Sequence, residues 1–117
     1  MRLNEISYND AVPIDGYGSG FFRVGGKKYD GPIMVLPTGV TAWGGFDDTA
    51  TILAAVADID VVFVGRGSEI CQPASDFRKT LEDAGIGVEA MASPAACRTY
   101  NVLLSEGRRV AVALLPG

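Results

Sequence analysis

The stretch Val61-Val62-Phe63-Val64-Gly65 decides the fold, because it is a continuous apolar, mostly β-branched run that ends at a glycine. A run without polar alternation is typical of a strand covered on both faces. Two more strand-like runs, Val88 to Met91 and Val110 to Leu115, follow at distances that leave room for a helix before each. The alternation predicts a βαβαβ core whose helices pack on a mostly parallel sheet.

Start and stop signals predict the two helices between these strands. Pro73 fits the first turn of the first helix, and Gly85 fits its end. Ser93 followed by Pro94 predicts an N-cap with proline at the first helical position, and Gly107 ends the second helix. Their apolar faces consist of Phe77, Leu81 and Ala84 in the first, and of Ala96, Tyr100, Leu103 and Leu104 in the second.

Upstream of this core the chain is rich in glycine and aromatic residues and shows no helical period. Residues 20–30 predict a hairpin whose turn is Gly25–Gly26. Ile33 to Leu36 and Val40 to Trp43 predict two further short strands. This half therefore predicts a β-rich hairpin element, a second small sheet or an edge, beside the α/β core.

Close pairs of carboxylates raise the question of acid–base chemistry. Asp47 and Asp48, with Thr49, are favoured N-cap residues for a helix near 49–57. Asp58 and Asp60 flank the start of a strand. Capping and solvated roles are the favoured interpretation of both pairs, so no catalytic residue is predicted.

The overall composition suits one domain over residues 1–117, with 48% hydrophobic and 21% charged residues. The net charge of −4 disfavours nucleic acid as a partner, because phosphate binding needs a basic surface. The absence of histidine excludes Ser-His-Asp chemistry and most zinc sites, and no cofactor motif is present. Two cysteines without a CxxC pair fit a reducing cytoplasm.

Nothing in the sequence predicts direct insertion into a membrane. The first residues lack the apolar segment of a signal peptide. The longest apolar run, Val110 to Leu115, is far shorter than the roughly 18–20 residues that a membrane span needs. The sequence predicts a cytoplasmic protein that reaches a membrane only through a partner.

The turn Gly65, Arg66, Gly67 and Ser68 follows the buried strand and is the first candidate site. Ligands of open α/β sheets bind beyond the carboxyl ends of strands, and glycine-rich turns can direct N–H groups at an anion. Arg66 would add charge-assisted hydrogen bonds. The alternative, which we favour, is a strand-exit turn that needs glycine dihedral angles. A phosphate loop at Gly26–Lys27 fails two motif positions.

Other residues admit both a functional and a structural interpretation. Cys71, before the first core helix, is a candidate redox thiol or an inert cysteine, whereas Cys97 is expected in the core. Trp43 and Phe46 are candidate aromatic residues of an interaction surface, with core burial of Trp43 as the alternative. Asn101, Glu106 and Arg108 predict either a polar clasp, a set of polar contacts that holds the last helix to the sheet, or a polar patch for a partner. Glu106 is expected to form an ion pair with Arg108 or Arg109.

Several short stretches, in order along nearly the whole chain, carry a family resemblance. They are Tyr17–Phe21, Pro37-x-x-Val40-x-x-Trp43, Val62–Gly67, Gly85–Met91, Arg98–Leu104, Glu106–Arg108 and Val110–Leu114. Together they resemble the Mth938-like family, a family of unknown function also called DUF498. The resemblance implies a three-layer α/β fold with a mixed central sheet and an extra β element, the last strand running antiparallel to its neighbours. Relatives usually have a small residue where this chain has Arg66.

The resemblance also carries an expectation of function. The family has no established enzymatic activity, and its best-understood relatives are assembly factors of mitochondrial respiratory complex I at the inner membrane. It therefore implies a non-catalytic interaction module that helps to assemble a membrane-associated, respiratory complex through an unidentified protein partner. The alternative is a small-molecule or anion-binding protein, or a weak enzyme, that uses the Gly65–Ser68 turn.

Overall fold

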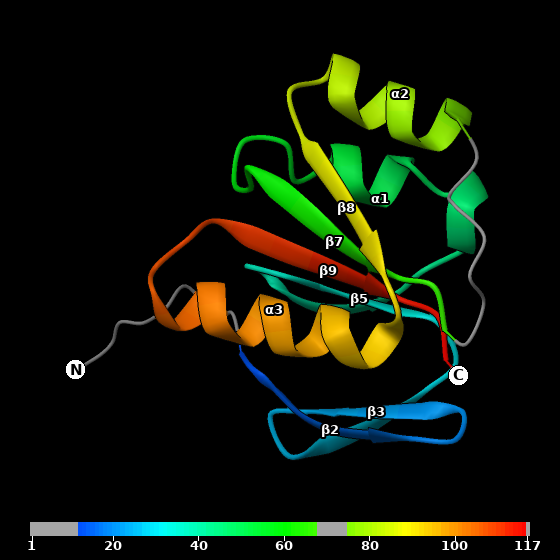
Figure 1. Ribbon diagram of the computed structural model, residues 1–117, viewed down its shortest axis with the longest axis vertical. Helices are drawn as coiled ribbons and strands as arrows, with labels where there is room; N and C mark the ends of the chain where they lie inside the picture. Colours follow the sequence, from blue (N-terminus) through cyan, green and yellow to red (C-terminus); the bar gives the residue numbers. More distant parts are fainter. Residues whose placement is uncertain (1–11, 68–74, 117) are drawn as a thin grey trace.

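The computed structural model describes residues 12–67 and 75–116, and a five-stranded sheet lies at its centre (Figure 1). The order of strands across this sheet is β6 (Gly39–Ala42), β5 (Ile33–Leu36), β9 (Val110–Leu114), β7 (Val61–Gly65) and β8 (Gly87–Met91). The strands predicted at Ile33–Leu36, Val40–Trp43, Val61–Gly65, Val88–Met91 and Val110–Leu115 are all present, with shifts of one residue at some ends.

The central sheet is mixed, as the family resemblance implies. β7 is parallel to both β8 and β9, whereas β5 is antiparallel to β9 and to β6. The expectation that the last strand is antiparallel to its neighbours is therefore wrong for β7. β9 is parallel to β7 because α3 (Ser93–Ser105) returns the chain to the starting end of the sheet before β9 begins.

Helices and a second sheet cover the two faces of the central sheet, which gives three layers (Figure 1). α1 (Ala50–Leu53) and α2 (Ser75–Asp83) lie on one face, and α3 lies on the other with the small sheet. The side chains of β7 divide accordingly. Val62 and Val64 pack in the cluster under α1 and α2, and Phe63 packs in the cluster under α3. The prediction of a strand covered on both faces is confirmed.

The small sheet consists of β2 (Ile14–Gly18), β3 (Phe21–Val24) and β4 (Lys27–Asp30), all antiparallel. The predicted hairpin with its turn at Gly25–Gly26 is confirmed as β3 and β4. The sheet packs on the α3 side of the central sheet through three buried side chains: Ile14, Phe22 and Val24.

The helix predicted near 49–57 is shorter than expected, because α1 ends at Leu53. Beyond it the chain continues in tighter turns, in which Val56 N–H donates to Leu53 C=O and Asp58 N–H to Ala55 C=O. These turns bring Ile59, which is 2% exposed, into the core just before β7.

Both core helices end at their predicted glycines. At the end of α3, the N–H of Arg108 donates to the C=O of Leu103, and the N–H of Gly107 donates to the C=O of Leu104. This is the Schellman arrangement, and it needs the positive φ of 79° that Gly107 adopts. Pro73, the predicted start of α2, lies outside the described residues.

The predicted start of α3 is wrong by one residue. Ala92 occupies the N-cap position, and Ser93 and Pro94 are the first two helical residues. The hydroxyl of Ser93 does not cap the helix, because it bonds to the ends of two neighbouring strands instead.

Candidate functional site: strand ends and exposed surfaces

The carboxyl ends of β7 and β8 lie side by side and are the place where an open α/β sheet is expected to bind a ligand. α2 follows β7 in the sequence and lies on one face of the sheet, whereas α3 follows β8 and lies on the other face (Figure 1). This divergence is the topological condition for a ligand site. The predicted turn at Gly65–Ser68 therefore stands at the right position in the fold.

The polar groups at this position are bonded within the protein. The N–H of Gly67 donates to the Ser93 hydroxyl over 2.8 Å, and that hydroxyl donates to the C=O of Leu115 over 2.7 Å. The N–H of Arg66 donates to the C=O of Met91 over 2.9 Å. Ser93, which is 3% exposed, thus joins the chain segments that follow β7, β8 and β9. The N–H groups of Arg66 and Gly67 are used for this contact and do not form an open anion nest.

The glycines of the turn are required by close packing. A Cβ on Gly65 would lie 2.6 Å from Ser93 Oγ and 2.8 Å from Leu114 Cδ2. A Cβ on Gly67, whose φ is +71°, would lie 2.7 Å from the C=O of Pro116. Ser68 lies outside the described residues. We call Gly65, Gly67, Ser93 and Leu115 the strand-end cluster.

Trp43 lies in the core. The expectation that Trp43 is an exposed contact residue is therefore wrong, and the alternative of core burial is correct. Trp43 is 3% exposed, and its indole N–H donates to the C=O of Asp48 over 3.1 Å. The Trp43 ring meets Phe46 and Phe77 with centroids 5.7 Å and 6.1 Å away. Phe46 is only partly buried, packed against the edge of the same core cluster.

The carboxylate of Asp48 stabilises the loop before α1. It accepts hydrogen bonds from the N–H of Gly44 over 3.0 Å and from the N–H and hydroxyl of Thr51. The hydrogen bond from Gly44 is the main cause that lowers the pKa of Asp48 below its ordinary value of 3.8. The Asp48 carboxylate therefore stabilises the start of α1, in agreement with the capping role that the sequence predicts.

Asn101 forms the polar clasp, but against β2 rather than the central sheet. Its side-chain oxygen accepts from the N–H of Ile14 over 2.8 Å, and its amide donates to the C=O of Ile14 over 2.9 Å. Glu106 and Arg108 are exposed, and within residues 12–67 and 75–116 neither forms an ion pair. Arg109 pairs instead with Asp60 over 3.2 Å, so the expected Glu106 ion pair is absent from this region.

Two ionisable groups on α3 are buried. Burial raises the pKa of the Cys97 thiol to about 11, which keeps the thiol protonated and confirms Cys97 as a core residue. Burial also raises the pKa of Tyr100, whose hydroxyl donates to the C=O of Val12 over 3.2 Å. Cys71, the candidate redox thiol, lies outside the described residues.

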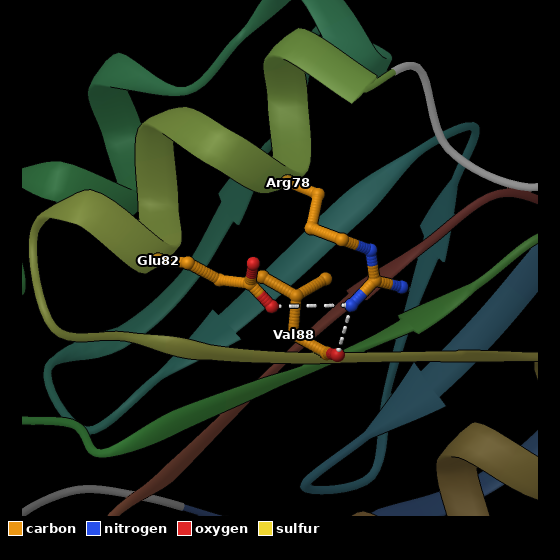
Figure 2. Close-up of polar contacts among 3 residues, drawn as sticks. All are labelled: Arg78, Glu82 and Val88. Atoms are coloured by element: carbon orange, nitrogen blue, oxygen red, sulfur yellow. Dashed lines mark hydrogen bonds and ion pairs between the residues drawn. The ribbon is translucent and has the colours of Figure 1, made fainter.

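The outer edge of β8 is occupied in part by an arginine of α2 (Figure 2). Arg78 Nη1 donates to the C=O of Val88 over 2.8 Å and lies 3.4 Å from Glu82 Oε2. A side chain that bonds to an edge strand reduces the pairing of that edge with another chain. This contact protects one edge of the sheet.

Over the described part of the chain, no group of three or more His, Cys, Asp or Glu residues is placed to hold a metal ion. The helices of that part include none of sufficient length and hydropathy to cross a membrane.

The three layers, the mixed sheet and the added small sheet define a Mth938-like α/β protein. The family model "Protein of unknown function (DUF498/DUF598)" matches residues 14–115, and the chain belongs to this family. An uncharacterised protein of Rhodobacter capsulatus is 41% identical over 99% of this chain and 94% of its own length.

Two further kinds of relatives bear on function and fold. The NADH dehydrogenase [ubiquinone] 1 alpha subcomplex assembly factor 3 of Rattus norvegicus is 33% identical over 99% of this chain, which spans 66% of that protein's length. A crystal structure described as an outer membrane protein of Bartonella henselae superimposes with a TM-score of 0.85 at 32% identity. It covers 94% of this chain and 98% of that one. A Mth938-like domain of Bordetella pertussis gives 0.75 at 31% identity, over 99% and 92% of the two chains.

Proposed function

We propose that this chain is a non-catalytic assembly protein that binds subunits of a membrane-associated respiratory complex of the NADH dehydrogenase type. The observation that carries the proposal is the likeness to assembly factor 3, which extends over 99% of this chain. The proposed location is the cytoplasm, with the protein held at the inner membrane through its partner.

The hydrogen bonds at the strand ends favour a protein-binding function over the alternative of a small-molecule or anion-binding protein. The N–H groups of Arg66 and Gly67, which the anion-binding alternative would use, donate to Met91 and Ser93. Of the two aromatic residues considered for partner contact, Phe46 has accessible surface and Trp43 does not. Phe46 therefore stays a candidate contact residue.

Affinity capture tests the proposal. The tagged chain is recovered from detergent-solubilised membranes of its source and analysed by quantitative mass spectrometry. An untagged strain and a tagged Gly65→Val variant, which is expected to misfold, serve as controls. We expect NADH dehydrogenase subunits to be enriched with the wild-type chain only. Recovery of the chain without any subunit of a respiratory complex would contradict the proposal.

A deletion strain gives a second and independent readout. Without the protein, native gels of solubilised membranes are expected to show less assembled NADH dehydrogenase and an accumulation of its partial assemblies. The wild-type chain supplied in trans should restore the assembled complex. An unchanged amount of assembled complex in the deletion strain would count against an assembly role.

A further inference from the structure

One face of the small sheet is exposed, and we call it the outer face. Residues directly opposite each other in an antiparallel pair share a face. Phe22 and Val24 of β3 point into the core, so their neighbours Phe21 and Arg23 point outward. The register then gives the six residues of the outer face: Gly16 and Gly18 on β2, Phe21 and Arg23 on β3, Lys28 and Asp30 on β4.

Two cations stand directly opposite each other on this face. Arg23 pairs with Lys28 in the register of β3 and β4, and both are exposed. Like charges at such positions destabilise a sheet. Among residues 12–67 and 75–116, no carboxylate forms an ion pair with Arg23. The pair lowers the stability of the isolated sheet, and this cost is relieved when an anion lies between the two cations.

The opposite neighbour of Arg23 leaves room for such an anion. Gly16 of β2 pairs with Arg23, and a Cβ on Gly16 would meet nothing within 4 Å. The surface on that side of Arg23 is therefore bare backbone with open space above it. A carboxylate at position 16 would have neutralised Arg23 within the sheet, but a glycine stands there.

The ammonium group of Lys28 lies over the aromatic ring of Phe21. The ring lies over Gly18, where an added Cβ would overlap it. Lys28 Nζ lies 5.0 Å from the centre of the Phe21 ring and 3.9 Å from a carboxylate oxygen of Asp30. Since both Lys28 and Asp30 are largely exposed, this ion pair is weak. Lys28 stays available to a stronger anionic partner.

The small sheet carries a net positive charge, whereas the chain as a whole carries a net negative charge. The strands and turns of this sheet carry three cations, Arg23, Lys27 and Lys28, and two carboxylates, Asp15 and Asp30. The whole chain has a net charge of −4. The outer face itself carries Arg23 and Lys28 against Asp30, a net charge of +1 on an acidic protein. A local excess of positive charge steers an anionic partner toward one orientation.

We propose that the outer face binds an acidic segment of a partner protein, whose carboxylates lie between Arg23 and Lys28 and over Gly16. This inference rests on the proposed assembly function and names the chemistry of the partner. An anionic membrane is disfavoured, because stable binding to lipid takes clusters of about four to eight cations. The small sheet has three, with two carboxylates beside them.

A titration followed by NMR tests the surface with a defined probe. The probe is hexaglutamate at low salt, and hexaglutamine is the matched neutral peptide. We expect hexaglutamate to shift the amide signals of Gly16, Arg23 and Lys28, and added salt to reverse the shifts. Shifts centred on Arg98 and Arg108, no localised shifts, or equal shifts with hexaglutamine would overturn the proposal.

Two double variants make the titration specific. Arg23→Gln with Lys28→Gln removes the proposed site, and Arg98→Gln with Arg108→Gln removes two exposed cations elsewhere. We expect the first variant to bind hexaglutamate about tenfold more weakly or worse, and the second to bind within about twofold of wild type. The first variant should keep its fold, with a melting temperature equal to that of wild type or up to about 4 °C higher.

Capture from cells separates this inference from the proposed function. If the wild-type chain recovers NADH dehydrogenase subunits and the Arg23→Gln, Lys28→Gln variant does not, both proposals are supported. If both chains recover them equally, the outer face is not the site, although the assembly role stands. Flotation of the chain with phosphatidylglycerol vesicles, without hexaglutamate binding, would assign the face to a membrane and overturn the proposal.

Discussion

The polar groups of the strand-end cluster are hydrogen-bonded within the protein, whereas the charged groups on the outer face of the small sheet are exposed to solvent. At the strand ends, Ser93 is buried, and its hydroxyl bonds to the N–H of Gly67 and the C=O of Leu115. On the outer face, Arg23 and Lys28 are exposed and stand opposite each other in the register of β3 and β4, where like charges destabilise a sheet. The position where α/β proteins commonly bind ligands is here used for stability, and the surface with unbalanced charge lies on the added sheet.

The largest expected effect comes from a side chain forced into the strand-end cluster. Gly65→Val would place a Cβ within 2.8 Å of Ser93 and Leu114, where the backbone cannot move without breaking the sheet. We expect a loss of about 3 kcal/mol or more in the free energy of unfolding, or no folded protein. Urea denaturation measures this. A Gly65→Val protein as stable as wild type would contradict the close packing of Ser93 and Leu114 around Gly65.

Removing the Ser93 hydroxyl should have the next largest effect. Ser93→Ala leaves the buried N–H of Gly67 and the partly buried C=O of Leu115 without this partner. We expect a loss of about 2–3 kcal/mol. Ser105→Ala is the matched control, because the Ser105 hydroxyl bonds to Val102 on the exposed side of the same helix. Equal effects of the two substitutions would contradict the structural role of Ser93.

Asn101→Ala tests the link between α3 and the small sheet. The substitution removes two hydrogen bonds to Ile14 in a half-buried place. We expect a loss of about 1–2 kcal/mol and faster hydrogen exchange at the Ile14 amide. NMR exchange rates report this locally. If the Ile14 amide exchanges at the wild-type rate, Asn101 does not hold β2.

The pH dependence of the free energy of unfolding should reveal the contribution of the Asp48 carboxylate. Its pKa is lowered in the folded protein, so its contribution is complete above the unfolded pKa and is lost as the pH falls through the folded pKa. We expect Asp48→Asn to be less stable than wild type near neutral pH, with a difference that narrows below about pH 4. Denaturation of both proteins across this range measures the difference. A constant difference would assign the effect to something other than the charge.

The smallest expected effect has the opposite sign. Arg23→Glu replaces the repulsion with Lys28 by an attraction across the two strands. We expect the free energy of unfolding to rise by about 0.2–1 kcal/mol. Arg98→Glu on α3 is the control for the change in net charge. A destabilised Arg23→Glu protein would show that Arg23 makes favourable contacts in the free protein.

The order of helices and strands was predictable, because apolar runs mark the elements and glycines mark the ends of the helices. Gly85 and Gly107 end the helices where the sequence indicates, and β7 is buried on both faces. The βαβαβ alternation also predicted the parallel direction of β9 relative to β7. The contrary expectation, that β9 is antiparallel to its neighbours, came from the family resemblance and holds for β5 alone.

The candidate sites were less predictable, because each depends on contacts between distant segments. A serine before a proline looks like an N-cap, yet Ser93 bonds to Gly67 and Leu115, which are 26 and 22 positions away. Trp43 is buried because Phe77 of α2 packs beside it, and no local pattern shows that contact. The Arg23–Lys28 pair requires the hairpin register, which the Gly25–Gly26 turn could have supplied.

A side-by-side capture most directly tests the claim that the protein acts through its outer face and not through its strand ends. Wild type, Ser93→Ala and the Arg23→Gln, Lys28→Gln variant are captured from the same membranes, and recovered NADH dehydrogenase subunits are counted per folded chain. We expect full recovery with Ser93→Ala and a strong loss with the Arg23→Gln, Lys28→Gln variant, although the latter is the more stable of the two variants. The reverse pattern would place the functional surface at the strand ends and contradict a role of the outer face.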